Sequence, residues 1–230
     1  MILYLTHNDQ PSGVYWSQVA GVVNHLNTLG EHPVKLVALV SARGFFSARR
    51  AIRARCAGAW VLPMVPTPQR WKWNTRLLAA VCRWLRPSGL ICRGPFATWM
   101  ALRMRDRGLT RKVCFDGRGA YAAEWQEYRV VDDQRLIDAM PALEREAVNA
   151  TDHRIAVSEA LVAHWRERYA YSGTAHTVIP CTLNAMTALV PAPAPAERVR
   201  FVYSGSAAGW QSFPLVERLV AELMQQPGAE

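Results

Sequence analysis

The first 40 residues, "MILYLTHNDQPSGVYWSQVAGVVNHLNTLGEHPVKLVALV" (Met1–Val40), decide the fold. A short apolar run at 1–6 is followed by a longer amphipathic stretch that starts near Gly13, and a second apolar run follows at 34–40. The stretch between them keeps its apolar residues on one helical face and ends at Gly30, a residue typical of helix C-termini. A strand, a helix and a fully apolar strand in this order predict a βα unit of a parallel sheet covered on both faces.

The same alternation continues to about residue 185. Further short apolar runs predict strands at 59–64, 89–94, 112–117, 153–158 and 176–181. Seven strands with helices between them are enough for one α/β domain with a doubly wound, mostly parallel sheet, which is a Rossmann-like fold.

Helical patterns lie between these strands at 71–86, 96–107, 133–152 and 159–170. Pro141 falls inside the third pattern and predicts a kink or an interruption, because proline lacks a backbone donor and clashes with the preceding turn. Ser158 is the expected N-cap of the fourth. Glu144 and Glu146 lie on different faces of the third helix, and we expect both to be solvated.

The composition changes at "VPAPAPAE", where a proline-alanine segment predicts an extended spacer. We therefore divide the chain into an N-terminal Rossmann-like domain at 1–185, a Pro/Ala linker at 186–197, and the opening strand and helix of a second domain at 198–230. One strand, one turn and one helix cannot close a core, so we expect this second domain to be incomplete.

The formal net charge of +9 favours phosphate-bearing partners: nucleotide-linked ligands, anionic lipid or nucleic acid. An arginine bias of the genome explains the same charge equally well. No helix-turn-helix, zinc-finger or RRM signature is present, so we do not predict nucleic-acid binding. The five cysteines include no CxxC pair, and the histidines show no metal-ligand spacing, so no metal site is predicted. The N-terminus has no signal-peptide pattern, and we expect a cytoplasmic protein.

The stretch "FDGRGAYAAE" follows a predicted strand, at the edge where parallel sheets bind ligands. Asp116 and Arg118 are candidate catalytic residues, since a carboxylate can orient a hydroxyl and a guanidinium can hold a phosphate. Gly117 and Gly119 would let the backbone approach a ligand, and Glu124 would face the same cleft from a loop. The alternative is an Asp–Arg pair that only locks the turn.

The turn after the first strand places Ser12 and Gly13 at a helix start, where free N–H groups favour an anion. These two residues are candidate substrate-binding residues. The alternative is a capped helix start that binds no ligand. His7 and Asn8 lie at the same strand end and are secondary candidates.

The segment 70–86, "RWKWNTRLLAAVCRWLR", combines tryptophans with arginines and a lysine. A basic amphipathic helix of this kind suits an anionic membrane surface, so the protein could lie at the inner face of the membrane. The alternative is a core-facing helix of the Rossmann-like domain with a solvated basic face.

Four segments resemble the family 4 glycosyltransferases, whose GT-B fold has two facing Rossmann-like domains. These segments are "SGVYWSQVAGVVNHLNTLGEHPVKLVAL", "FDGRGAYAAEW", "LEREAVNATDHRIAVSEALVAHWRERY" with the later "VIPC", and "FVYSGSAAGWQS". Their order matches the N-terminal domain of the family and the opening of the C-terminal one.

The resemblance implies a retaining transferase that takes sugar from a nucleotide-sugar donor, without another cofactor, in cell-surface polysaccharide or glycolipid assembly. The N-terminal domain would bind a saccharide or lipid-linked acceptor. Gly205 and Ser206 would contact donor phosphates, although the basic residue that often follows in the family is absent from "AAGWQ". Many members also have two glycines where this chain has Ser12 and Gly13.

The donor-binding segment of the family, with its pair of late glutamates, has no counterpart in the sequence. We therefore expect a truncated transferase that is inactive alone. The alternative is a non-catalytic binding module, or a partner subunit, with a Rossmann-like fold.

Overall fold

A computed structural model describes residues 1–65, 68–181, 203 and 212–225. The described residues belong to two separate units, one within Met1–Asn184 and one within Ala185–Glu230. Each unit is considered by itself below.

The first unit is built on one sheet of seven parallel strands in the order β3-β2-β1-β4-β5-β6-β7. The strands are β1 (Ile2–His7), β2 (Val34–Val40), β3 (Trp60–Pro63), β4 (Gly89–Arg93), β5 (Lys112–Gly117), β6 (His153–Ala156) and β7 (His176–Val178). Each of the seven predicted strands is present, so the predicted doubly wound α/β fold is confirmed. Because all strands are parallel, the loops that follow β1 and β5 lie at the same edge of the sheet.

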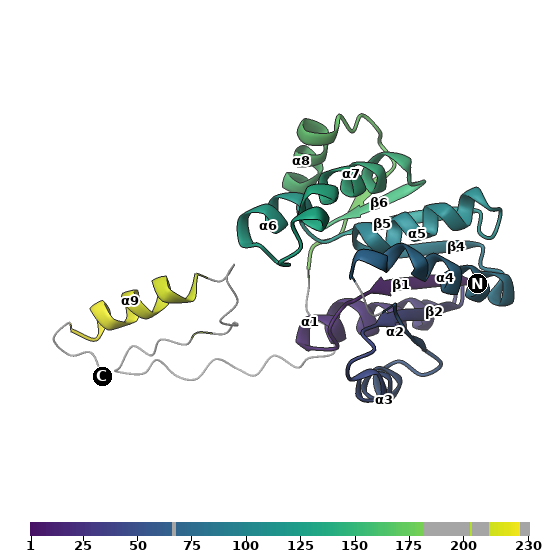
Figure 1. Cartoon of the computed structure of the whole chain (residues 1–230), viewed down its shortest axis with the longest axis horizontal. Coiled ribbons are helices and arrows are strands. Elements are labelled where there is room, and N and C mark those ends of the chain that lie inside the picture. Colours follow the sequence, from purple (N-terminus) through teal and green to yellow (C-terminus); the bar gives the residue numbers. More distant parts are fainter. Residues whose placement is uncertain (66–67, 182–202, 204–211, 226–230) are drawn as a thin grey trace. The chain divides into compact units, whose positions relative to one another are not determined.

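Helices cover both faces of this sheet (Figure 1). In chain order they are α1 (Gly13–Tyr15), η1 (Trp16–Ala20), α2 (Gly21–Leu29), α3 (Phe45–Arg55), η2 (Pro68–Trp73), α4 (Asn74–Leu85), α5 (Gly94–Asp106), α6 (Tyr121–Tyr128), α7 (Gln134–Ala150) and α8 (Glu159–Tyr169). The first helix, α1, continues through the π-helical turn η1 into α2, which ends at Gly30 with a φ of 73°. The predicted glycine C-cap is confirmed, since φ values in this range favour glycine.

Two packed layers fill the space between sheet and helices. On one face Leu3 and Leu5 of β1 pack with α4 and α5, and on the other Tyr4 packs with η1 and α2. Successive strand residues point to opposite faces, so both layers draw on the same strands. A third cluster joins β5 to α7 and α8 around the fully buried Trp165.

Several local expectations are corrected by the structure. The helix α7 continues through Pro141, so the expected interruption is absent. The helices α3 and α6 were not predicted. Ser158 accepts a hydrogen bond from the Leu161 amide at 3.2 Å, which confirms it as the N-cap of α8.

The second unit contains α9 (Phe213–Leu223), at the position where the sequence predicts a helix. The predicted linker at 186–197 lies outside the described residues. Among the residues that the structure describes, no helix is long and apolar enough to cross a bilayer.

Candidate functional site

A cleft of about 410 Å³ lies at the carboxyl edge of the sheet in the first unit. It is bounded by the ends of β1 and β4, the start of α5, α6, and the loop into α7. Its polar lining consists of His7, Asn8, Asp9, Gln10, Arg93 and Tyr121. Its apolar lining includes Trp71, Phe96, Trp125, Val130, Val131 and Met140. The volume falls in the range of about 300–1,000 Å³ that small-molecule sites occupy.

The position of this cleft follows from the strand order. Strand β1 pairs with β2 on one side and with β4 on the other, so the chain order reverses between β1 and β4. At such a switch point the two connecting loops part, and a crevice opens beyond the strand ends. Asp9 follows β1 and Arg93 ends β4, so the crevice has a carboxylate and a guanidinium at its base.

Asp9 and Arg93 form a loose ion pair, with 3.7 Å between the Arg93 Nε and the Asp9 Oδ1. Burial raises the pKa of Asp9 to about 6, although the neighbouring Arg93 lowers it. Burial also disfavours the charge of Arg93, but Asp9 and nearby tyrosines raise its pKa on balance. Arg93 Nη2 donates to the Gln18 side-chain oxygen at 3.0 Å, which holds the guanidinium at the base of the cleft.

A second polar group lies beneath the cleft, on β5. The Asp116 side chain is 0% exposed, and its Oδ2 accepts a hydrogen bond from Arg118 Nη2 at 3.1 Å. Its Oδ1 lies 2.8 Å from Arg118 Nε, an ion-pair contact without hydrogen-bond geometry. The Tyr4 hydroxyl of β1 also donates to Asp116. Burial, and then the Asp116 charge, raise the pKa of Tyr4 well above its ordinary value. Oδ2 of this carboxylate thus accepts two hydrogen bonds, and Oδ1 has an ion-pair contact with Arg118 but no hydrogen bond within the described part of the chain.

The predicted catalytic pair is brought together by this network, and neither residue lines the cleft. Gly117 and Gly119 follow, and neither has a positive φ. A Cβ on Gly117 would come within 2.6 Å of the Trp165 ring, so tight packing requires the glycine there. Ligand contact by Gly117 and Gly119 stays a prediction.

Glu124 was expected in a loop but lies in the first turn of α6, and the residue is exposed. Its Oε1 would lie 2.1 Å from a Cβ on Gly119, which shows how closely the carboxylate approaches that glycine. Partial desolvation of the carboxylate raises the pKa of Glu124, although the residue as a whole is exposed. Like the Asp116 pair, Glu124 does not line the cleft.

Ser12 and Gly13 are exposed at the start of α1, where Ser12 makes no side-chain capping hydrogen bond. A Cβ on Gly13 would have no atom within 4 Å, so the space beside it is open. Anion binding at these two residues stays a prediction. Gly205 and Ser206 lie outside the described residues.

The expectation that Glu144 is solvated is wrong. Its side chain is 0% exposed and accepts hydrogen bonds from the amides of Tyr121 and Ala122, at 3.2 and 2.8 Å, and from the Tyr169 hydroxyl at 2.9 Å. Glu144 of α7 thereby caps the N-terminus of α6 and joins it to α8. Burial raises the pKa of Glu144, although the hydrogen bonds that the carboxylate accepts lower it in part.

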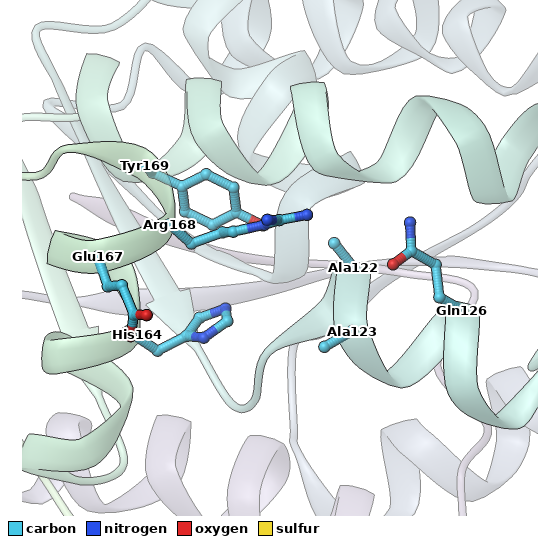
Figure 2. Close-up of a pocket in the computed structure, with 7 residues that line it drawn as sticks. All are labelled: Ala122, Ala123, Gln126, His164, Glu167, Arg168 and Tyr169. Atoms are coloured by element: carbon cyan, nitrogen blue, oxygen red, sulfur yellow. The ribbon is translucent and has the colours of Figure 1, made fainter.

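A smaller hollow of about 260 Å³ lies between α6 and α8, next to this contact (Figure 2). It is lined by Ala122, Ala123, Gln126, His164, Glu167, Arg168 and Tyr169. None of the predicted site residues lines it. Within the described part of the chain no cluster of three His, Cys, Asp or Glu residues could hold a metal ion.

His7 shares the cleft with aromatic rings. The ring centroid of His7 lies 5.6 Å from that of Phe96 and 6.4 Å from that of Trp71. The His7 Nε2 lies 3.3 Å from the side-chain nitrogen, Nδ2, of Asn74. Burial lowers the pKa of His7 to about 4, so the imidazole is neutral at physiological pH. This secondary candidate therefore lines the cleft as an uncharged ring.

Sequence reasoning missed Asp9, Arg93 and Tyr121, which line the cleft. A usable signal was present for Arg93, because a charged residue in the apolar run "GLICRG" stands at the carboxyl end of its strand. Asp9 had a weaker one, in the polar run "THNDQ" after the first strand.

Comparisons by sequence find no match, either among protein-family models or among curated proteins. Solved structures do share the fold. Sucrose-phosphate synthase from Thermosynechococcus elongatus matches with a TM-score of 0.56 and 11% identity, over 80% of this chain and 48% of that protein. S. aureus MnaA, in a co-structure with UDP, matches with a TM-score of 0.53 and 13% identity, over 77% of this chain and 44% of that protein.

The chain thus spans about half the length of the solved structures that it matches. Identities this low show the fold alone. The expected Rossmann-like fold of a GT-B domain is confirmed, and glycosyltransferase activity and membership of family 4 stay predictions.

Proposed function

We propose that the chain is the acceptor-binding half of a retaining, nucleotide-sugar-dependent glycosyltransferase of family 4, acting in cell-surface polysaccharide or glycolipid assembly. The observation that supports it is the cleft at the switch point of the sheet, with Asp9 and Arg93 at its base and aromatic rings on its walls. Open α/β sheets bind small molecules at this position.

The lining suits a saccharide-bearing acceptor. The Asp9 carboxylate accepts hydrogen bonds from hydroxyl groups, and the Asn8 amide both donates and accepts. The ring of Trp125 offers an apolar face to the C–H side of a sugar. A few polar groups in a mostly apolar cleft fix the orientation of a ligand.

We propose that Asp116 and Arg118 act as positioning residues. Asp116 pairs in register with Arg93 on the neighbouring strand β4, so the buried contacts of Asp116 with Tyr4 and Arg118 fix the strand end that presents Arg93. Direct contact with a substrate would require the Asp116–Arg118 pair to open. Breaking a buried pair is costly, which favours the positioning role.

The donor would be a nucleotide sugar held by the second domain, with its phosphates at Gly205 and Ser206. Ser12, Gly13 and Glu124 would complete the substrate contacts from the edge of the first domain. The assignments of Gly205 and Ser206 follow the resemblance to family 4 alone. Those of Ser12, Gly13 and Glu124 also follow the position of these residues after β1 and β5, at the carboxyl edge of the sheet.

We further propose that the helix at 70–86 docks the protein on an anionic membrane at the cytoplasmic face. Trp73 and Trp84 are 55% and 78% exposed, whereas Trp71 is 5% exposed and packs against Phe96. Exposed tryptophans beside arginines suit headgroups. Trp71 is thus unsuited to this role, which would fall to Trp73 and Trp84.

A second candidate function is a binding module without chemistry. It is favoured by the closed Asp116–Arg118 pair, because the two side chains first predicted to do chemistry are occupied with each other. The transferase and the binding module would both bind a ligand in the cleft, and only the transferase would turn it over.

Titration of the purified chain with short saccharides and with nucleotide sugars, by calorimetry, tests the acceptor proposal. We expect saccharide binding to weaken at least tenfold in Trp125→Ala, because the ring forms a wall of the cleft. Trp84→Ala is the matched control, since this exposed tryptophan of α4 lies outside the cleft, and its binding should stay within twofold. Equal binding by both variants would rule out the cleft as the acceptor site.

Turnover separates transferase from module. Release of nucleotide from a nucleotide sugar in the presence of acceptor, by the chain together with a donor-domain partner, would support the transferase. Saccharide binding without any such release, under all pairings, would support the module.

Membrane docking is tested by sedimentation with anionic vesicles. A Trp73→Ser/Trp84→Ser variant should lose most of the binding, and Phe46→Ser is the control because Phe46 is 81% exposed on α3, at the opposite face of the sheet. Unchanged sedimentation of the double variant would exclude this surface.

A further inference from the structure

The guanidinium of Arg93 has donor capacity that the protein does not use. Its side chain is 11% exposed, Nη2 donates to Gln18, and Nε lies 3.7 Å from Asp9, beyond hydrogen-bond distance. Its Nη1 is buried and has no hydrogen-bond partner among the described residues. Buried charged donors are nearly always satisfied, so Arg93 lacks an acceptor.

The nearby carboxylates do not supply that acceptor. Asp116 is engaged by Arg118 and Tyr4, and Asp9 keeps 32% of its side chain exposed at a loose distance from Arg93. An anion at the base of the cleft would therefore lie beside a guanidinium that has one unused donor, Nη1. The planar guanidinium group of an arginine can donate two parallel hydrogen bonds to two oxygens of a phosphate.

A second donor stands beside Arg93. The Tyr121 hydroxyl lies close to Gly94, where a Cβ would be 3.2 Å from it, and both residues line the cleft. Burial raises the pKa of Tyr121, so this hydroxyl stays protonated and able to donate. Arg93 and Tyr121 thus both line the cleft, Arg93 from the end of β4 and Tyr121 from the start of α6.

The wall of the cleft on α6, the loop after it and α7 is apolar apart from Tyr121. It is formed by Trp125 of α6, Val130 and Val131 of the following loop, and Leu136 and Met140 of α7. No charged side chain of the described residues lines this wall. A cleft with a cation at the strand ends and an apolar wall on α6 and α7 matches a ligand that has an anionic head and an apolar chain.

We propose that the cleft binds a lipid phosphate, with its phosphate held by Arg93 and Tyr121 and its hydrocarbon chain along Trp125, Val130 and Met140. This inference rests on the proposed acceptor role of the cleft and specifies the acceptor as phosphate-linked. Free phosphate or the phosphates of a nucleotide could use the same donors, and the test includes both.

The first test uses the wild-type chain and needs no variant. Geranyl phosphate, geraniol, inorganic phosphate and UDP are titrated separately by calorimetry at fixed ionic strength. We expect geranyl phosphate to bind at least tenfold more tightly than geraniol and than inorganic phosphate, because charge-assisted hydrogen bonds and apolar burial both contribute. Geraniol as tight as geranyl phosphate, or UDP tighter than both, would overturn the proposal.

Variants then test each end of the cleft. Arg93→Gln should weaken geranyl phosphate at least tenfold and leave geraniol within twofold, and Arg50→Gln is the control for the lost charge because Arg50 is exposed on α3. Val130→Asp, at a residue that is 44% exposed, should weaken geranyl phosphate and leave inorganic phosphate unchanged. A similar loss of geranyl phosphate binding in Arg93→Gln and Arg50→Gln would overturn the assignment.

Asp9→Asn distinguishes this inference from the acceptor role itself. Removing the competing carboxylate should tighten geranyl phosphate about threefold, whereas it should weaken neutral saccharides, whose hydroxyls Asp9 would accept. Saccharide binding that persists without phosphate preference would end the lipid-phosphate inference and leave the acceptor proposal standing. Geranyl phosphate binding without any saccharide binding would exclude a saccharide as the acceptor and support a lipid phosphate as the acceptor.

Discussion

Replacing Arg118 by methionine should destabilise the first unit severely. The substitution keeps most of the aliphatic stem but leaves the Asp116 carboxylate, which is 0% exposed, with only the Tyr4 hydroxyl as a partner. Breaking a buried ion pair from one side costs about 3–5 kcal/mol. Because Arg118 keeps 13% of its side chain exposed, we expect the lower end, about 3 kcal/mol. That is a large part of the total stability of about 5–15 kcal/mol of a typical domain.

Urea unfolding of the full chain, followed by far-ultraviolet circular dichroism, measures this loss. The double variant Asp116→Asn/Arg118→Met removes the stranded charge, so it should recover about 2 kcal/mol relative to Arg118→Met. Arg103→Met is the matched control, because Arg103 pairs with Glu146 at 2.7 Å on the surface, and such pairs contribute about 0–1 kcal/mol. A loss below about 1 kcal/mol in Arg118→Met, or additive losses in the double variant, would refute the structural role of the pair.

Three further outcomes are expected. The pKa of His7 is lowered from 6.5 to about 4 in the folded protein, so the unfolded state binds more protons between these pH values. The stability of wild type relative to His7→Asn should therefore fall by about 3 kcal/mol as the pH drops from 6.5 to 4. A difference that stays constant with pH would contradict this. Gly117→Ala should cost about 1–3 kcal/mol in urea unfolding because of the 2.6 Å approach to Trp165, whereas Gly13→Ala, in open space, should cost nothing. Glu144→Ala should cost about 3 kcal/mol in the same assay, and a cost within 0.5 kcal/mol would exclude its capping role.

The sheet could be predicted because its strands are continuous apolar runs. Strands such as β2, "VKLVALV", are covered on both faces by helices, and their local composition alone reports that burial. The same holds for the C-cap at Gly30, whose φ of 73° needs a residue type that the sequence displays.

The two missed helices lack such local signals. In α3 only Ile52 is buried, and the helix follows Gly44 without a side-chain cap. In α6 the first residues have no local cap, because their amides bond to Glu144, more than 20 residues later in the chain. A helix that depends on a distant carboxylate cannot be read from its own residues.

The position of the cleft was predicted, but of its lining residues only His7 and Asn8 were among the candidates. The strand ends were correct, yet the cleft uses Asp9 and Arg93, which meet only because β1 lies beside β4 in the strand order. Asp116 was read as accessible because its partner Tyr4 is 112 residues away, and nothing in the local sequence indicates that a phenol covers it.

The buried contact of Glu144 ties the geometry of the cleft to α8, a helix that does not line it. Because α6 contributes Tyr121 and Trp125 to the cleft and begins on the Glu144 carboxylate, while the same carboxylate accepts from Tyr169 of α8, strain introduced into α8 would be transmitted to the wall of the cleft. Random mutagenesis scored by ligand affinity would therefore recover substitutions in α8 as apparent binding defects. Such hits would report on the anchorage of α6 and not on a second binding region.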